Sequence, residues 1–516
     1  MRLHPLLILL VLAGSAHAAG PGVNANADGT ELIPPAGPHA VGLRVVQQYD
    51  YSRTLEPQVD AFGKSAGAVP ARPIQTLVWY PAKAGTGKGT PMQVVDYRQD
   101  SLADIDFAPA AADVARQRAA WLAGAQKVQY GAATLAVRGA APAEGRFPVV
   151  IYAPSFASSA YENLDLCEYL ASHGYLVIAS RSLGARSVTM TDDIDGIEAQ
   201  AADIAFLVNY AQSLPQADMT QVAAAGFSWG GMANVFAAAR SGRIKALVSL
   251  DGSIRFHPKI WGAATYVRPA HTAVPLLYLG ARAPTAEAME RDDKLGASYI
   301  NTMKYADVYV TTMAPMTHSD FSSVQLRFAR DAAFGDYRRA EVLQAYRSGA
   351  LYVRRFLDAY LKQDQQALAF LRQSPAKNGI GPQTMAMEYH PASASAFGEG
   401  DFLRAFAKGG YQDAQPLYAR MTAQSPAFKL NPLNLNRLGY QLLGAKNARG
   451  AVELFKLATH IEPRYGNAFD SEGEAYEALG DTPSAIVAYE KAVAVDQGQA
   501  NAVARIKALK AGAAKP

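Results

Sequence analysis

Short runs of apolar residues alternate with longer amphipathic stretches through the middle of the chain. Strands buried on both faces are expected for the runs at 149–152, 175–179, 222–225, 246–250, 274–279 and 308–312. The apolar residues of 161–173 and 195–214 recur with the period of an amphipathic helix. Because buried strands alternate with helices, the pattern predicts an α/β fold, a mostly parallel, doubly wound sheet covered by helices on both faces.

Two more strands are predicted before this core. Residues 43–49 and 74–80 are rich in β-branched and aromatic residues, and we expect them to pair as a ribbon whose second strand ends at Pro81. The stretch 101–145 has a weaker pattern, in which only 113–125 looks helical. Whether this stretch forms a lid over a functional site stays open at this point.

The run 222–225 leads directly into Gly226-Phe227-Ser228-Trp229-Gly230 and then into small residues that suit a helix. A strand, a very tight turn and a helix are the context in which Gly-x-Ser-x-Gly exposes a nucleophilic serine. Gly226 and Gly230 lack Cβ atoms, so the strand and the helix can cross closely with Ser228 at the apex. The backbone N–H of Trp229 would then point to where an oxyanion forms.

A serine nucleophile needs a base and a group that orients the base, and in this fold the chain order is Ser, acid, His. Of the histidines after Ser228, only His318 comes directly after a late apolar strand, so it is the predicted base. Asp251 follows the run 246–250 and is the favoured acid. The loop after 274–279, the more usual place, offers the alternatives Glu287, Glu290, Asp292 and Asp293.

The second oxyanion donor should come from the turn after the strand 149–152. We expect the backbone N–H of Phe156 to act there together with that of Trp229. No cofactor is predicted, and no metal site, because the acidic stretch 192–196 lacks the rest of a calcium-binding loop. Cys167 is the single cysteine; it is expected in the core and excludes an internal disulfide framework.

The N-terminal residues predict the compartment. Arg2 precedes a short apolar run at 6–12, and Ala16-His17-Ala18 follows it, which is typical of a secretory signal peptide cut near Ala18. The alternative, an uncleaved membrane anchor, is disfavoured because the run is short for a bilayer. We therefore expect a periplasmic or secreted protein with no stable membrane span. A net charge of +4 over 516 residues does not favour nucleic acid as a partner.

The last third of the chain repeats itself every 34 residues. Gly439 recurs as Gly473 and Phe455 as Tyr489, and small residues keep the same spacing. Small residues at helix crossings with aromatics between them, at this period, resemble tetratricopeptide repeats, and 401–424 looks like a poorer copy. Such arrays bind peptides or proteins or mediate self-association, and the alternative for so few repeats is a packing appendage of the hydrolase. The predicted domains are 1–18 signal peptide, 19–375 hydrolase, 376–397 linker and 398–510 helical repeats.

Several motifs in 37–375 together resemble bacterial dienelactone-hydrolase-like α/β-hydrolases and the related platelet-activating-factor acetylhydrolases. They are Gly37-Pro38-His39-Ala40-Val41-Gly42, the strand 73–81, Phe147-Pro148-Val149-Val150, the segment 226–231 and His318-Ser319-Asp320-Phe321. The resemblance implies the α/β-hydrolase fold and an ester-hydrolysing triad. The acetylhydrolases place the acid directly after the strand that follows the elbow, which favours Asp251.

Two departures from these families bear on function. Dienelactone hydrolases use a cysteine nucleophile, and Ser228 stands in its place, so dienelactone is not the expected substrate. Pro154-Ser155-Phe156 replaces the His-Gly-apolar oxyanion loop of the acetylhydrolases. The prediction is an exported serine carboxylic-ester hydrolase that forms an acyl-enzyme. The alternatives are a catalytically inactive hydrolase-fold platform with a peptide-binding repeat array, and an acyltransferase that uses the same triad.

Overall fold

The computed structural model of the chain describes residues 31–56, 62–64, 71–85, 89–282, 298–393, 397–425 and 428–513. The chain divides into two compact units. The larger, here called the sheet unit, ends at His390. The smaller, here called the helical unit, comprises Pro391–Pro516 with Pro269–Ala273 and Met303–Ala306. The predicted signal peptide, residues 1–18, lies outside the described residues.

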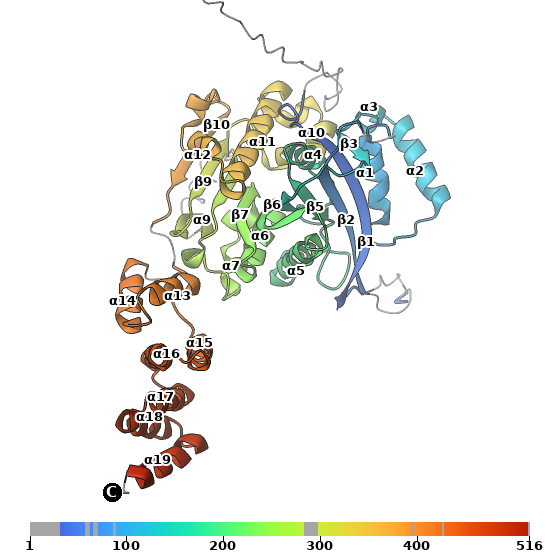
Figure 1. The fold of residues 1–516 in the computed structure, drawn as a ribbon. Coiled ribbons are helices and arrows are strands. Elements are labelled where there is room, and N and C mark those ends of the chain that lie inside the picture. Colours follow the sequence, from blue (N-terminus) through green and yellow to red (C-terminus); the bar gives the residue numbers. More distant parts are fainter. Residues whose placement is uncertain are drawn as a thin grey trace, which may run out of the picture. The chain divides into compact units, whose positions relative to one another are not determined.

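The sheet unit is organised around a ten-stranded sheet with the order β10-β9-β8-β7-β6-β4-β5-β2-β1-β3 (Figure 1). Its parallel centre consists of β4 (Phe147–Ala153), β5 (Leu176–Ser180), β6 (Ala217–Phe227), β7 (Ile244–Leu250), β8 (Leu276–Ala281) and β9 (Val308–Met313). All the apolar runs therefore form strands, and the predicted α/β fold class is confirmed. Since these strands are parallel, their carboxyl ends lie along one edge of the sheet.

The predicted ribbon extends this sheet. β1 (Ala40–Thr54) pairs antiparallel with β2 (Ala71–Ala82), with Leu43 opposite Trp79. β2 in turn pairs antiparallel with β5, and the short β3 (Ala136–Arg138) pairs with β1. The ribbon is therefore continuous with the parallel core, which the sequence pattern did not predict.

Helices pack on both faces of the sheet. α4 (Leu164–Ser172) and α11 (Arg339–Leu361) share one apolar core with Ala225 of β6 and Val248 of β7. α5 (Ile194–Ala211) and α6 (Trp229–Arg240) pack together against the other face, where a Cβ added at Gly231 would lie 2.6 Å from Ser249 Oγ. Cys167 of α4 is buried in the first core, as predicted.

The remaining helices in the described part of the sheet unit lie in its connections. They are α1 (Val94–Asp100), α2 (Ala111–Ala123), α3 (Lys127–Tyr130), α7 (Pro258–Ala263), α9 (Tyr299–Thr302), α10 (Ser323–Phe328) and α12 (Gln365–Leu371). Short 3-10 helices lie at Ser101–Ala103, Ser253–Arg255, His318–Phe321, Asp331–Phe334 and Pro375–Asn378, and Pro269–His271 in the helical unit forms another. None of the described helices is long and apolar enough to cross a membrane.

The predicted linker 376–397 is wrong as far as His390. Residues Met385–His390 form β10, which pairs antiparallel with β9 at the end of the sheet, with Met385 opposite Met313. Met385 is buried, and alternate residues of β10 are exposed. Six residues that alternate in this way are too few to stand out beside proline and alanine in the sequence. The sheet unit therefore extends to His390 instead of 375.

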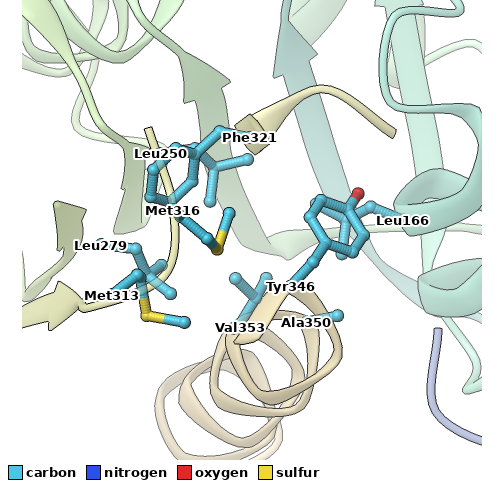
Figure 2. Close-up of a pocket in the computed structure, with 10 residues that line it drawn as sticks. Leu166, Leu250, Leu279, Met313, Met316, Phe321, Tyr346, Ala350 and Val353 are labelled. Atoms are coloured by element: carbon cyan, nitrogen blue, oxygen red, sulfur yellow. The ribbon is translucent and has the colours of Figure 1, made fainter. Parts of the chain in front are cut away.

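A small apolar cavity of ≈ 10 Å³ lies between α11 and the carboxyl ends of the central strands (Figure 2). It is lined by Leu166, Leu250, Leu279, Met313, Met316, Phe321, Tyr346, Gly349, Ala350 and Val353. All its lining side chains that Figure 2 labels belong to the buried core. The cavity is thus an imperfection of packing beneath the strand ends.

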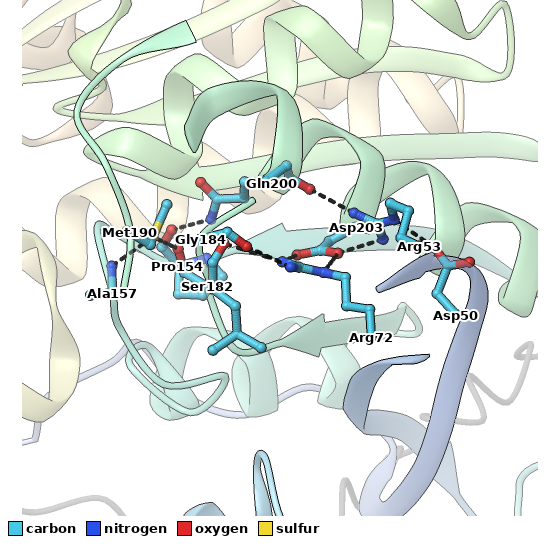
Figure 3. A network of polar contacts seen from close by, with 12 residues as sticks. Asp50, Arg53, Arg72, Pro154, Ala157, Ser182, Gly184, Met190, Gln200 and Asp203 are labelled. Carbon is cyan, nitrogen blue, oxygen red and sulfur yellow. Dashed lines mark hydrogen bonds and ion pairs between the residues drawn. The ribbon is translucent and has the colours of Figure 1, made fainter. Parts of the chain in front are cut away.

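On the other side of the sheet, a buried ionic cluster joins the ribbon to α5 (Figure 3). The Arg72 guanidinium, 0% exposed, donates to both oxygens of Asp203 at 2.7 and 2.6 Å. It also donates to the backbone carbonyl of Gly184, and Arg53 donates to Asp203 at 2.7 Å. Because every charge here has a partner, the cluster is tolerated in the interior.

The helical unit contains α13 (Glu399–Lys408), α14 (Ala414–Gln424), α15 (Pro432–Gly444), α16 (Ala448–Ile461), α17 (Gly466–Ala478), α18 (Thr482–Val495) and α19 (Ala500–Ala513). Residues that recur at the 34-residue spacing make equivalent helix–helix contacts. A Cβ added at Gly439 of α15 would collide with the Phe455 ring of α16, and one added at Gly473 of α17 would lie 2.6 Å from the Tyr489 ring of α18. The same close helix crossing therefore occurs in successive helix pairs.

Candidate active site

Ser228 occupies a sharp turn between β6 and α6. Its backbone has φ 54° and ψ −116°, a left-handed conformation that a non-glycine residue rarely adopts. A Cβ at Gly226 would lie 2.6 Å from the carbonyl carbon of Gly230, and one at Gly230 would collide with the backbone oxygen of Ala153. The two glycines are therefore required for the strand and the helix to approach, and the half-buried Ser228 is held at the apex.

The structure brings Ser228, His318 and Asp251 together at the strand ends. His318 Nε2 lies 2.9 Å from Ser228 Oγ, and His318 Nδ1 lies 2.6 Å from Asp251 Oδ2. The side chain of Asp251 is 6% exposed, whereas that of His318 is 54% exposed. A carboxylate can only accept, so Nδ1 carries the imidazole proton and Nε2 is free to accept the hydroxyl proton of Ser228.

Asp251 is held by groups at the end of the neighbouring strand β8. Its Oδ1 accepts from the backbone N–H of Ala281 at 2.9 Å, and from the Tyr278 hydroxyl at 3.5 Å. Its own amide donates to the carbonyl of Leu279 at 2.6 Å, and its φ of 42° turns the side chain out of the strand direction. The predicted alternatives Glu287, Glu290, Asp292 and Asp293 lie outside the described residues.

A capping arrangement fixes the loop that carries His318. Asp320 Oδ2 accepts from the Thr317 amide at 2.7 Å and from the Thr317 hydroxyl at 2.8 Å. The amide of Arg282, just after β8, donates to the carbonyl of Met316 at 3.0 Å. The histidine loop is therefore attached to the same strand that supports Asp251.

Phe156 and Trp229, the predicted sources of the oxyanion donors, lie side by side. Their rings meet edge to face with centroids 5.6 Å apart, and the Trp229 indole also meets the His257 ring edge to face at 6.0 Å. Among the described residues, neither the Trp229 nor the Phe156 amide has a hydrogen-bond partner. Phe156 is 42% exposed, so its amide belongs to a surface turn.

The turn that contains Phe156, residues 154–158 and here called the oxyanion turn, has buried supports that the sequence analysis missed. The carboxylate of Glu162 accepts from the Ser155 amide at 2.8 Å and also from the Ser155 hydroxyl. The Ala157 amide donates to Met190 Sδ at 3.0 Å, and Gln200 Nε2 donates to the Pro154 carbonyl at 2.7 Å (Figure 3).

No local signal in the sequence marks these supporting residues. Glu162 lies two residues before the start of α4 and looks like an ordinary helix-start acid, whereas Met190 and Gln200 belong to a different segment of the chain. Burial raises the pKa of the Glu162 carboxyl, and the hydrogen bonds from Ser155 oppose that rise.

The described residues contain no group of three or more His, Cys, Asp or Glu side chains that could hold a metal ion. The groups assembled at Ser228 are a hydroxyl, an imidazole and a carboxylate, and the next residue, Trp229, adds an unpaired amide. This set can deprotonate a serine and stabilise an oxyanion, which are the requirements of acyl transfer.

Residues 125–254 match the model of the Chlorophyllase family. The matched segment includes Phe156, Ser228, Trp229 and Asp251, and it ends before His318. This match and the fold support a serine ester hydrolase. A ferulic acid esterase from Streptomyces cinnamoneus is similar in structure, with 20% identity, a TM-score of 0.49 and coverage of 69% of this chain and 98% of that chain. No curated protein matches the chain.

Proposed function

We propose that the chain is a serine carboxylic-ester hydrolase that works through an acyl-enzyme. Ser228 Oγ attacks the ester carbonyl while His318 takes its proton. Asp251 orients the imidazole, and the amides of Phe156 and Trp229 hold the oxyanion. His318 then protonates the leaving alcohol, and a water molecule activated by the same imidazole releases the acid.

One observation carries this proposal. The hydroxyl, the imidazole and the carboxylate form a continuous chain of contacts, 2.9 Å and 2.6 Å long, although they come from the ends of three different strands. The strained φ of 54° at Ser228 supports the same role, because such a conformation persists only where the surroundings enforce it.

The test is fluorophosphonate labelling of the full chain, with the modified residue located by mass spectrometry, beside turnover of a short-chain aryl ester. We expect labelling at Ser228, and we expect Ser228→Ala to abolish both labelling and turnover. Folded wild-type protein that neither labels nor turns over would favour the inactive platform. Transfer of the acyl group to an added alcohol in preference to water would favour the acyltransferase.

We also propose that residues 1–18 direct export to the periplasm or the medium, and that the helical unit is a tetratricopeptide-like array. The second proposal is supported by the crossing of Gly439 with Phe455, which is repeated by Gly473 with Tyr489. Its partner would be a peptide, another protein or a second copy of the chain. N-terminal sequencing of the exported protein tests the cleavage near Ala18, and light scattering of the full chain tests self-association.

A further inference from the structure

We infer that Glu162 is a positioning residue that holds the Phe156 amide in place as an oxyanion donor. The inference rests on the proposed function. Glu162 itself does not touch the reacting atoms. It acts through Ser155, whose amide and hydroxyl both donate to its carboxylate.

The amides of the oxyanion turn differ in whether they have a hydrogen-bond partner. Pro154 has no N–H, the Ser155 amide donates to Glu162, and the Ala157 amide donates to Met190 Sδ. The Ser158 amide donates to the Ser155 carbonyl at 3.2 Å. Among the described residues, the Phe156 amide is therefore the one N–H of the turn without a partner. Because the neighbouring Ser155 amide is bonded to the buried Glu162, it is not available to a substrate. A substrate oxyanion therefore meets a single N–H from this turn, that of Phe156.

Glu162 is also attached to the histidine loop. The backbone carbonyl of Glu162 accepts from the Ser322 hydroxyl at 3.0 Å and from the Val324 amide at 3.2 Å. The next residue, Asn163, accepts from the Ser323 amide at 2.7 Å. These serines directly follow the 3-10 helix His318–Phe321. Glu162 thus connects the oxyanion turn with the segment that carries the base.

Glu162 is 5% exposed, and a carboxylate in such a position loses most of its hydration. Its hydrogen bonds from Ser155 offset that loss, but an apolar side chain would avoid the loss altogether. A buried carboxylate at this position is therefore not explained by a contribution to the stability of the fold. The geometry that it imposes on the oxyanion turn explains it better.

The experiment compares Glu162→Gln with Glu162→Asp in the full chain. Glutamine keeps the length of the side chain, and its Oε1 can still accept from the Ser155 amide while its NH₂ group donates to the Ser155 oxygen. Aspartate keeps the charge but withdraws the carboxylate by about 1.5 Å, one carbon–carbon bond. The reach of the side chain and its charge are thereby separated.

The readouts are kcat per active site titrated with fluorophosphonate, KM, and the affinity for a trifluoromethyl ketone, which binds as a tetrahedral oxyanion. Because loss of one oxyanion donor lowers kcat about 10²- to 10³-fold, we expect Glu162→Asp to lower kcat at least about 10-fold and to weaken the ketone similarly. KM should change less than about 3-fold, since the ground-state ester does not need this donor. Glu162→Gln should remain within about 3-fold of the wild type in all readouts.

Glu168→Asp is the matched control. Glu168 is also fully buried and accepts from the Tyr97 hydroxyl and the Leu135 amide at 2.5 and 2.6 Å, away from the oxyanion turn. Its shortening should lower the melting temperature and leave kcat per titrated site unchanged. If Glu162→Asp does not fold, Glu162→Met replaces it, because methionine keeps the length and removes both acceptors.

Three results would overturn the inference. The first is a wild-type kcat per titrated site in Glu162→Asp. The second is an equal loss of kcat in Glu162→Asp and Glu162→Gln. The third is a larger loss of kcat in Glu162→Gln than in Glu162→Asp, which would mean that the charge of the side chain matters and its length does not. Failure of the proposed function looks different, because the wild-type chain would then neither label at Ser228 nor hydrolyse the ester.

Discussion

Replacing Asp251 with asparagine tests which group donates and which accepts in the hydrogen bonds that link the acid, the base and the nucleophile. The orientation of the new amide follows from the structure. The Ala281 N–H points at Oδ1 from 2.9 Å, so the asparagine must place its carbonyl oxygen there and its NH₂ group toward His318. That NH₂ group then donates to Nδ1, 2.6 Å away in the wild type, and drives the imidazole proton to Nε2. An Nε2–H cannot accept the proton of Ser228.

The expected loss follows from this wrong tautomer. In a serine triad of another fold, the same substitution lowers kcat about 10⁴-fold with intact geometry. For Asp251→Asn we expect a loss of about 10³- to 10⁴-fold, or about 4 to 5 kcal/mol of transition-state stabilisation. The assay is kcat for a short-chain aryl ester, together with the rate of fluorophosphonate labelling at Ser228. The melting temperature of the variant should stay close to that of the wild type.

Asp292→Asn is the matched control, because it changes a carboxylate of the loop after 274–279 that the sequence offers as an alternative acid. It should leave kcat within about 3-fold of the wild type, because Nδ1 of His318 is already in contact with Asp251. If Asp251→Asn retained a tenth or more of wild-type kcat while Asp292→Asn lost activity, the assignment of Asp251 as the orienting acid would be refuted, and with it the argument from the Ala281 amide.

Three further substitutions test the packing. Burial raises the pKa of Glu168 from 4.5 to about 7, so its contribution to stability is fully present below pH 4.5 and is lost by about pH 7. Glu168→Gln should flatten this fall of about 3 kcal/mol in urea titrations at pH 4 and 8, and an unchanged fall would contradict the raised pKa. Gly349→Ala should raise the unfolding free energy by about 0.5–1 kcal/mol, because alanine has a higher helix propensity than glycine in α11. The new Cβ would lie 3.1 Å from Leu279 Cδ2, at the border of the cavity in Figure 2. A lower melting temperature would contradict this expectation. Gly473→Ala should destabilise the helical unit by about 1–3 kcal/mol, because its Cβ would overlap the Tyr489 ring, and unchanged thermal unfolding would refute the crossing.

The elements of the central sheet and the candidate nucleophile were predictable from the sequence alone. Apolar runs and the tight Gly226–Gly230 turn act locally, because burial on both faces and the absence of a Cβ atom are properties of the residues themselves. The position of His318 after a late strand was predictable for a related reason, since parallel strands end at one edge. The 34-residue spacing likewise anticipated the matching crossings at Gly439 and Gly473.

Contacts between residues far apart in the chain were decided only by the tertiary structure. The sequence left Asp251 in competition with the loop after 274–279. The contact of Asp251 with His318, 67 residues away, depends on how β7, β8 and β9 end side by side. Glu162 and β10 show the same limit: a carboxylate that accepts from Ser155 and a short strand that joins β9 have no distinctive local pattern. Hydrogen-bond partners are set by distances in space, and a residue's own chemistry does not specify which distant group will lie within 3 Å of it.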